Sequence, residues 1–241
     1  MSDRKIKKIL SNGEDLGEAR AKAGFSVIFD MDGTLIDNTP YHFKSWQALF
    51  KKYNKGELTI DTYHQEISGI PIMDTMRRLF GDDHDEAGLK ALLKEKEDLY
   101  KSLYAPFAAP VNGLENFLTE LKNAGVKMAI ASSATVDDIN FILSHVPIRD
   151  DFEVIIDGSR VSKSKPNPQI FLKAAEELNA RPEDCVVFED SIAGIKAANA
   201  AGMKVVGITT GNTADKLQPS DLVITDYTDV NANKLAALFG S

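Results

Sequence analysis

The sequence has few of the features that mark secreted, membrane-spanning or nucleic-acid-binding proteins. Its single cysteine, Cys185, excludes an internal disulfide and suits a reducing compartment. No apolar stretch approaches the ~20 residues of a membrane span, and residues 1–24 lack the apolar segment of a secretory signal. With 28 basic against 36 acidic residues, the net charge is −8, and no basic cluster suits a nucleic-acid groove. We therefore expect a soluble, cytoplasmic monomer that binds neither nucleic acid nor membranes.

Apolar residues make up 43% of the chain, which is enough for a substantial core. Six short apolar runs predict β-strands, at residues 25–30, 126–132, 153–157, 185–189, 204–208 and 222–224. Apolar residues at helical spacing predict helices between them, at residues 114–124, 136–143, 169–178 and 192–201. Nearly all-apolar strands that alternate with helices are typical of a parallel sheet covered on both faces. The pattern therefore predicts an α/β fold with a doubly wound parallel sheet.

One interval interrupts this alternation. Roughly eighty residues separate the first strand from the helix that begins at Leu114, which is far more than a ~30-residue βαβ unit needs. Four segments within it have helical patterns, at residues 41–53, 60–67, 74–80 and 86–103. We predict an inserted all-helical domain at residues 39–107, with hinges at residues 37–40 and 104–110. Residues 25–38 and 108–241 form the predicted core, and residues 1–24 an N-terminal extension without an assigned function.

Polar residues follow four of the predicted strands. The first strand ends at Asp30, with Asp32 beyond it, and the others are followed by Ser132 and Ser133, by Lys165, and by Glu189 and Asp190. Ligands of open α/β sheets bind at the carboxyl ends of the strands, where the strand order reverses. If the fourth strand returns beside the first, both acid pairs meet there. A divalent ion would relieve their repulsion, and ligation by oxygen alone favours Mg²⁺.

Mg²⁺ in such a site commonly binds a substrate phosphate, which gives the other residues candidate roles. Ser132 can donate a hydrogen bond to a phosphoryl oxygen, and Lys165 can offset negative charge. An aspartate can act as nucleophile, and Asp32 can transfer protons. Taken singly, each feature has a simpler explanation: a strand-end turn, a helix N-cap or a solvated lysine. Four strand ends with complementary chemistry favour the catalytic interpretation.

These motifs resemble a known family. "DMDGTL", the serine of "ASS", the lysine of "KPNP" and the run "FEDSIAGIKAANAAGM" are similar to the four signature motifs of the haloacid dehalogenase-like phosphotransferases. The resemblance spans residues 25 to about 224 and implies a Rossmann-like core with a helical cap domain. It also implies Asp30 as nucleophile, Asp32 as general acid and base, and Mg²⁺ bound by Asp30, the Asp32 carbonyl and Asp190, with assistance from Glu189. The presence of Asp32 argues against true dehalogenation.

The segment "PYHFKSW" and the cap layout most resemble β-phosphoglucomutase and related sugar-phosphate phosphatases. The candidate substrate-binding residues are Thr34, His42, Arg77, Lys96 and Ser133. The mutase pattern has an arginine in a cap loop, where this chain has the apolar residues 70–73. Arg77, Arg78 or Lys96 could substitute, although surface charge explains them equally well.

We therefore predict three functions in order of preference. The first is a phosphatase that acts on a small phosphorylated metabolite such as a sugar phosphate. The second is a β-phosphoglucomutase, and the third is a non-catalytic module that binds Mg²⁺ or phosphate.

Overall fold

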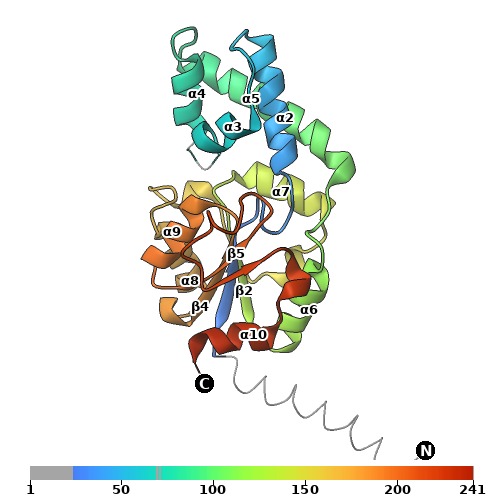
Figure 1. The fold of residues 1–241 in the computed structure, drawn as a ribbon, viewed down its shortest axis with the longest axis vertical. Coiled ribbons are helices and arrows are strands. Elements are labelled where there is room, and N and C mark those ends of the chain that lie inside the picture. Colours follow the sequence, from blue (N-terminus) through green and yellow to red (C-terminus); the bar gives the residue numbers. More distant parts are fainter. Residues whose placement is uncertain (1–23, 69, 71, 241) are drawn as a thin grey trace, which may run out of the picture.

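The computed structural model describes residues 24–68, 70 and 72–240. The predicted N-terminal extension, apart from Gly24, lies outside the described residues. Two lobes stand one above the other, a mixed α/β core and a smaller helical cap (Figure 1). No helix in the described part of the chain is both long enough and apolar enough to cross a bilayer.

The core is built on a parallel sheet whose strand order confirms the doubly wound prediction. The order is β3-β2-β1-β4-β5-β6, so the chain winds outward in one direction and then returns beside β1. Phe29 of β1 is level with Ile130 of β2 and Phe188 of β4, so the three strands end together. The strands are β1 (Ser26–Phe29), β2 (Lys127–Ala131), β3 (Val154–Ile156), β4 (Cys185–Glu189), β5 (Lys204–Ile208) and β6 (Leu222–Ile224).

Helices cover both faces of this sheet because alternate strand residues point to opposite sides. Val27 and Phe29 pack with α6 (Leu114–Asn123), α7 (Val136–His145) and α10 (Ala232–Ala236). Ile28 packs on the other side with α8 (Gln169–Glu177) and α9 (Ile192–Ala200). The turn α10 was not predicted, because five residues are too few to show a helical period. Short 3-10 turns complete the lobe: η1 (Ala105–Phe107), η2 (Arg149–Asp151), η3 (Gly158–Arg160), η4 (Pro182–Asp184), η5 (Tyr227–Asp229) and η6 (Ala237–Phe239).

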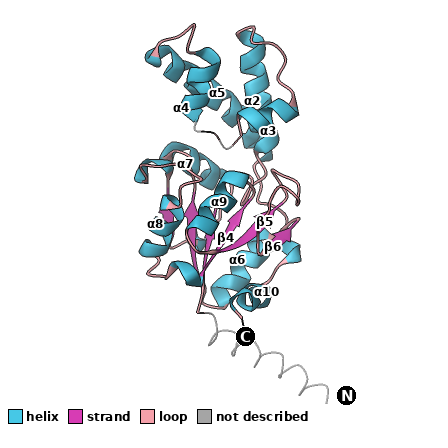
Figure 2. Cartoon of the chain, turned by 60° about the vertical axis from the view of Figure 1, so that its left-hand side comes forward, coloured by secondary structure: helices cyan, strands magenta, loops and turns pink. Residues whose placement is uncertain are grey.

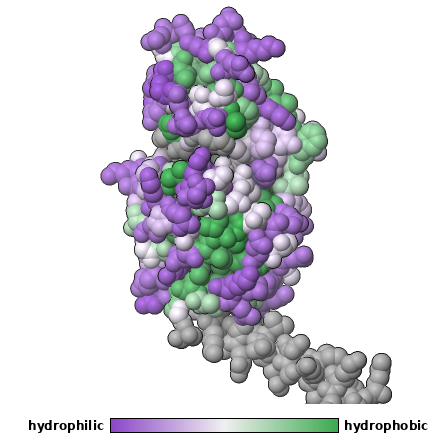
Figure 3. All heavy atoms as spheres, viewed as in Figure 1, coloured by the Kyte–Doolittle hydropathy of each residue, from purple (hydrophilic) through white to green (hydrophobic). Residues whose placement is uncertain are grey.

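Four helices between β1 and α6 form the cap, above the carboxyl ends of the strands (Figure 2). They are α2 (Thr39–Lys52), α3 (Ile60–Glu66), α4 (Ile72–Phe80) and α5 (Glu86–Tyr104). Trp46, Leu49, Phe80 and Leu89 belong to a separate apolar cluster inside the cap. On the face that Figure 3 shows, hydrophilic residues cover most of the cap, whereas an apolar area lies on the core. The cap therefore has its own core and meets the α/β lobe across the predicted active-site edge.

Candidate active site

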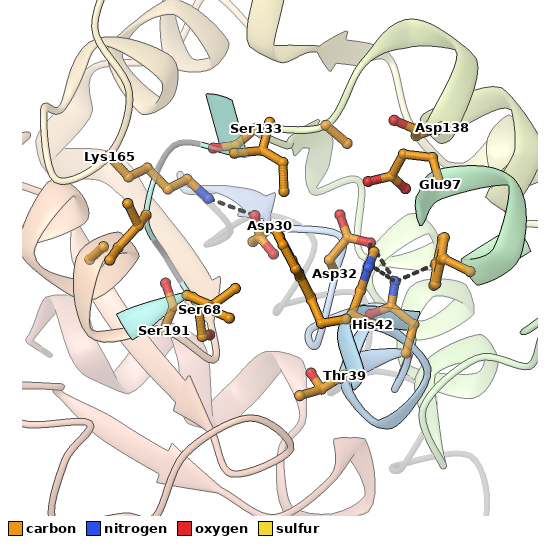
Figure 4. Close-up of a pocket in the computed structure, with 18 of the residues that line it drawn as sticks. Asp30, Asp32, Thr39, His42, Ser68, Glu97, Ser133, Asp138, Lys165 and Ser191 are labelled. Carbon is orange, nitrogen blue, oxygen red and sulfur yellow. Dashed lines mark hydrogen bonds and ion pairs between the residues drawn. The ribbon is translucent and has the colours of Figure 1, made fainter. Parts of the chain in front are cut away.

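Lys165 connects the first and fourth strand ends. Its Nζ lies 2.6 Å from Asp30 Oδ1 and 2.5 Å from Glu189 Oε1, and the lysine side chain is only 8% exposed. Burial lowers the pKa of Lys165, but the charges of Asp30 and Glu189 raise it overall, so the ammonium stays protonated. Lys165 reaches Asp30 from the loop after β3 (Figure 4). The predicted convergence of these strand ends is thus present as a buried ion-pair network.

Asp30, Glu189 and Asp190 form a buried acidic cluster. One carboxylate oxygen from each lies within 4.8 Å of the others. Burial raises the pKa of Asp30 to about 8; Lys165 opposes the rise, while Glu189 and Asp32 add to it. Burial, followed by the charges of Glu189 and Asp30, also raises the pKa of Asp190. An all-oxygen cluster in which burial and mutual repulsion oppose the ionisation of Asp30 and Asp190 is suited to a hard divalent ion.

Glycines make room for these carboxylates. A Cβ on Gly33 would lie 2.2 Å from Asp190 Oδ2, and a Cβ on Gly194 would lie 1.8 Å from Glu189 Oε1. The backbone at Gly33 also has a φ of +78°, a conformation that residues with a Cβ rarely adopt. The glycines after β1 and after β4 are therefore required by close approach of the acids.

Asp32 belongs to a second network that extends into the cap. Asn38 donates a hydrogen bond to Asp32 Oδ1 at 2.5 Å and another to the hydroxyl of Tyr100 at 2.7 Å. His42 Nε2 lies 3.9 Å from Asp32 Oδ1, and the imidazole stacks on Tyr100 with ring centroids 3.8 Å apart. Burial raises the pKa of Asp32, but hydrogen bonding by His42 and Asn38 and the positive charge of Lys96 lower it overall. Asp32 is therefore ionised at pH 7.

Lys96 sets the protonation state and the tautomer of His42. The buried Lys96 ammonium lies 2.9 Å from His42 Nδ1 and also donates to Glu97 at 2.9 Å. Burial and the Lys96 charge lower the pKa of His42, although Asp32 opposes them, so the imidazole is neutral at pH 7. An ammonium has no acceptor, so Nδ1 must accept from it and the ring proton lies on Nε2, toward Asp32.

A cavity of about 530 Å³ lies between the lobes and contains both networks. The core contributes Asp30, Lys165 and Asp190 to its floor, and helix α7 contributes Asp138. The cap contributes the polar residues His42, Lys96 and Glu97 and several apolar ones. Figure 4 shows Asp138 and Glu97 on the same side of the cavity, away from Lys165. This volume suits a small-molecule ligand. The apolar lining residues from the cap are Trp46, Ile67, Ile70, Ile72, Met73 and Leu93.

Most predicted site residues meet here, but their positions differ in detail. Ser133 lines the cavity, whereas the Ser132 hydroxyl is buried at the end of β2 and accepts the N–H of Ala134 at 3.1 Å. Thr34 does not reach the cavity: its side chain is fully buried, and its carbonyl accepts a hydrogen bond from Tyr227. The prediction that Thr34 contacts substrate is therefore not supported, because the turn after β1 directs it into the core.

The arginines of α4 also lie away from the cavity. Arg77 forms ion pairs with Glu86 at 2.6 Å and Asp74 at 3.0 Å, with its side chain 51% exposed. Arg78 pairs with Glu66 at 2.9 Å. The simpler explanation, surface charge, fits both residues, and Arg77 is not placed to bind substrate. Of the cap cations considered from the sequence, Lys96 is the one that lines the cavity.

Asn38, Glu97, Tyr100 and Asp138 are among the lining residues that were not foreseen from the sequence. Asn38 follows the predicted hinge aspartate and could have been suspected as the residue before a helix. Glu97 and Tyr100 had a weaker signal, since Glu97 directly follows Lys96 in the sequence and Tyr100 lies four residues after it, about one helical turn away. Asp138 had none, because its position in the first turn of α7 is also that of an ordinary N-terminal acid.

Comparison with known proteins agrees with this geometry. The family model described as "Haloacid dehalogenase-like hydrolase" matches residues 27–208, which include all four motifs. The chain belongs to the haloacid dehalogenase-like hydrolase family. It is therefore an enzyme of the phosphatase or phosphomutase class, and the non-catalytic alternative is set aside.

Individual family members cover most of the chain. It is 31% identical over 218 residues to the β-phosphoglucomutase of Bacillus subtilis strain 168, covering 87% of this chain and 93% of that protein. It is 30% identical over 179 residues to a phosphorylated carbohydrates phosphatase of Thermotoga maritima, covering 74% and 82%. The crystal structure of a family IA, variant 3 hydrolase from Entamoeba histolytica superposes with a TM-score of 0.82 at 26% identity, covering 90% and 100%. The haloacid dehalogenase-like fold, with its cap, therefore extends over nearly the whole described chain.

Proposed function

We propose that this haloacid dehalogenase-like hydrolase is a Mg²⁺-dependent phosphatase that hydrolyses a small phosphorylated metabolite, such as a sugar phosphate, through a phosphoaspartate at Asp30. The observation that carries the proposal is the pairing of Asp30 with Lys165 on the floor of a cavity of about 530 Å³, beside Asp32. A carboxylate nucleophile and a proton-transfer acid two residues apart are the parts that acyl-phosphate chemistry requires.

The chain's own residues divide the work as follows. The Asp30 carboxylate attacks phosphorus, and the bond from phosphorus to the leaving oxygen breaks. Lys165 balances charge on Asp30 and on the phosphoryl group, and Ser132 or Ser133 binds a phosphoryl oxygen. Asp32 in its protonated form gives its proton to the leaving oxygen. It then accepts a proton from the water that attacks the phosphorus of the phosphoaspartate. The bond from phosphorus to the Asp30 oxygen breaks, inorganic phosphate leaves, and both acids return to their starting forms.

The lowered pKa of Asp32 is compatible with this role. A bound phosphate brings negative charge next to Asp32, which raises the pKa of that carboxyl and favours its protonated form. Asn38 and His42 then hold the carboxyl group in place during both proton transfers.

The acidic cluster fits Mg²⁺ by its donor chemistry. Asp30 and Asp190, with Glu189 close to them, offer oxygen ligands within 4.8 Å of one another, and we assign the carbonyl of Asp32 to the same set. When bound, Mg²⁺ would supply positive charge that neutralises phosphoryl oxygens.

Charge on the cavity wall supports hydrolysis over mutase activity. Among the described lining residues, the basic side chains are Lys165, Lys96 and His42, and both lysines are already paired with acids. The wall away from Lys165 carries Glu97 and Asp138 instead of a free cation. A mutase must hold a sugar that carries a second phosphate, typically through a bidentate arginine. A monophosphate fits this wall better.

β-Phosphoglucomutase activity is the second candidate. It is supported by the similarity to the Bacillus subtilis enzyme over 87% of the chain. The chain of contacts from Lys96 through His42 to Asp32 also brings a cap residue next to the acid/base aspartate, so closure of the cap could select a sugar over water.

A screen of phosphorylated metabolites tests these proposals. The purified protein is incubated with each compound, with Mg²⁺ or with a chelator, and phosphate release and sugar isomerisation are both followed. We expect phosphate release that requires Mg²⁺ and is fastest for a sugar monophosphate. Isomerisation without phosphate release would favour the mutase, and turnover in the chelator would contradict the metal assignment.

A further inference from the structure

The loop after β5 contacts the acid-bearing turns, although it lies outside the four motifs. We call residues 209–213 the post-β5 loop. Because β5 is parallel to β4, with Gly207 level with Glu189, this loop leaves the sheet at the edge where Asp190 lies. The N–H of Thr209 donates to the carbonyl of Ile224 at 3.0 Å, so the start of the loop is fixed to the edge strand β6.

Two side chains of the post-β5 loop bind the backbone of the acidic turns. The Thr210 hydroxyl donates to the carbonyl of Gly33, in the turn that carries Asp32. The Asn212 amide donates to the carbonyl of Asp190 at 3.0 Å. One short loop thus connects the turn after β1 with the turn after β4, although these turns are far apart in the sequence.

Two glycines enclose the Asp190 carboxylate between these turns. A Cβ on Gly211 would lie 1.9 Å from Asp190 Oδ2, and a Cβ on Gly33 would lie 2.2 Å from the same atom. Only a hydrogen on each Cα leaves room for the oxygen. The carboxylate is therefore bounded by backbone on two sides, and the Thr210 hydrogen bond links those two sides.

We propose that Thr210, Gly211 and Asn212 act as positioning residues that set the orientation of the Asp190 carboxylate for a divalent cation. This inference rests on the proposed role of Asp190 as a Mg²⁺ ligand. A ligand held in place before binding loses less freedom when the ion arrives, and partners behind metal ligands contribute to affinity in this way.

Mg²⁺ titration of the purified protein, monitored by calorimetry, tests this positioning role, which we call the Asp190 clamp, without measuring catalysis. Thr210→Val removes the hydroxyl with little change in shape, whereas Thr210→Ser keeps it. We expect Thr210→Val and Asn212→Ala each to weaken Mg²⁺ binding by about tenfold or more. Thr210→Ser should bind close to the parent, and Gly211→Ala should bind most weakly, because its methyl group would occupy the place of Asp190 Oδ2.

Asn199→Ala is the matched control, because its amide also donates to backbone carbonyls, those of Ile195 and Pro219 at 2.9 Å. It should lower the thermal midpoint of unfolding without changing Mg²⁺ affinity. Parent-like affinity in Thr210→Val and Asn212→Ala would overturn the clamp, as would equal losses in Thr210→Ser and Thr210→Val. If the parent bound no Mg²⁺, the clamp would fall together with the metal assignment, whereas phosphate release by that parent would still uphold the phosphatase.

Discussion

The chemical behaviour of each residue in this site depends more on its surroundings than on its residue type. Asp30 and Asp32 are two residues apart, yet burial raises the pKa of Asp30 while the cap network lowers that of Asp32. A divalent cation bound beside Asp30 would lower the pKa of that carboxyl and favour the ionised form that a nucleophile needs. Lys165 touches Asp30 and Asn38 touches Asp32, which is why each acid has a distinct environment.

Replacement of Asp30 tests the nucleophile. Asp30→Asn keeps the shape but a neutral amide does not attack phosphorus, so we expect turnover to fall by at least about a thousandfold. Thermal unfolding should stay near that of the parent, since the amide can still accept a hydrogen bond from Lys165. Phosphate release measures the effect, and mass spectrometry of the substrate-treated parent should find phosphate on the Asp30 peptide. Substantial turnover by Asp30→Asn would rule out this assignment.

Cys185 should be unreactive in the folded protein. It is fully buried on β4, its thiol donates to the carbonyl of Arg181 at 3.3 Å, and burial raises its pKa to about 12. Little thiolate exists at pH 8, so a disulfide reagent should label no thiol in the native protein and one per chain after denaturation. Because Cys185 is the sole cysteine, the count is unambiguous. Rapid labelling of active protein would contradict this.

The side chains of the active site lie at the ends of strands and at the start of a helix. The strands β1, β2 and β4 end level with one another, and α9 begins directly beyond Asp190. The Ser191 side chain caps α9 by accepting the N–H of Gly194 at 3.0 Å, and it also donates to Glu189 Oε2 at 2.9 Å. The start of this helix therefore holds Glu189, which in turn holds Lys165.

The variant Gly194→Ala tests whether the packing of Glu189 outweighs helix propensity at this position. Alanine favours helix by roughly 1 kcal/mol over glycine, yet its Cβ would lie 1.8 Å from Glu189 Oε1. We expect the displaced carboxylate to move Lys165, and phosphate release to fall by about tenfold or more. Gly88→Ala in α5 is the matched control, because the Gly88 N–H also donates to an N-cap side chain, that of Asp85. If both variants retained parent activity, the role of Glu189 in holding Lys165 would be wrong.

The whole molecule forms its cavity from two lobes, so substrate choice depends on residues that face each other across it. Lys101 of α5 and Asp138 of α7 form an ion pair at 2.6 Å, and Tyr100 packs edge-on against Phe141. These contacts join the cap to the core beside the cavity wall. On that wall Glu97 pairs with Lys96 and Asp138 pairs with Lys101, so both lysines are already bound to acids.

An arginine placed on the cap tests this view. Ile72 lines the cavity at the start of α4, so Ile72→Arg adds a cation to the cap wall. With glucose 1-phosphate and a trace of the bisphosphate, the parent should release mostly phosphate. The variant should shift toward glucose 6-phosphate by about 10- to 150-fold, since charge-assisted hydrogen bonds contribute roughly 1.5–3 kcal/mol each.

Ile60→Arg is the control for this experiment. Ile60 is 44% exposed, so an arginine at this position adds the same charge outside the cavity. It should leave the partition unchanged. Fast isomerisation by the parent, with little phosphate released, would reverse the order of the two proposed functions. It would mean that Lys96 holds the second phosphate despite its pairing with Glu97.

The sequence by itself determined the fold class and the core of the site. Apolar runs identified all six strands, and the return of the fourth strand beside the first, which the sequence left as a condition, is a constraint that the doubly wound sheet imposes. The same constraint brought Asp30, Lys165, Glu189 and Asp190 together, since residues after parallel strands share one edge. These are features of local pattern and topology, which a sequence carries directly.

Only the tertiary structure decided how side chains from distant segments meet. Thr34 is buried and Arg77 is paired on the surface, because a turn and a helix face set their directions, which residue type does not reveal. The Asn38–Tyr100 hydrogen bond joins residues 62 positions apart, and Thr210 reaches Gly33 across 177. Such contacts depend on how whole elements pack together, and a local sequence pattern does not show which distant residues will meet.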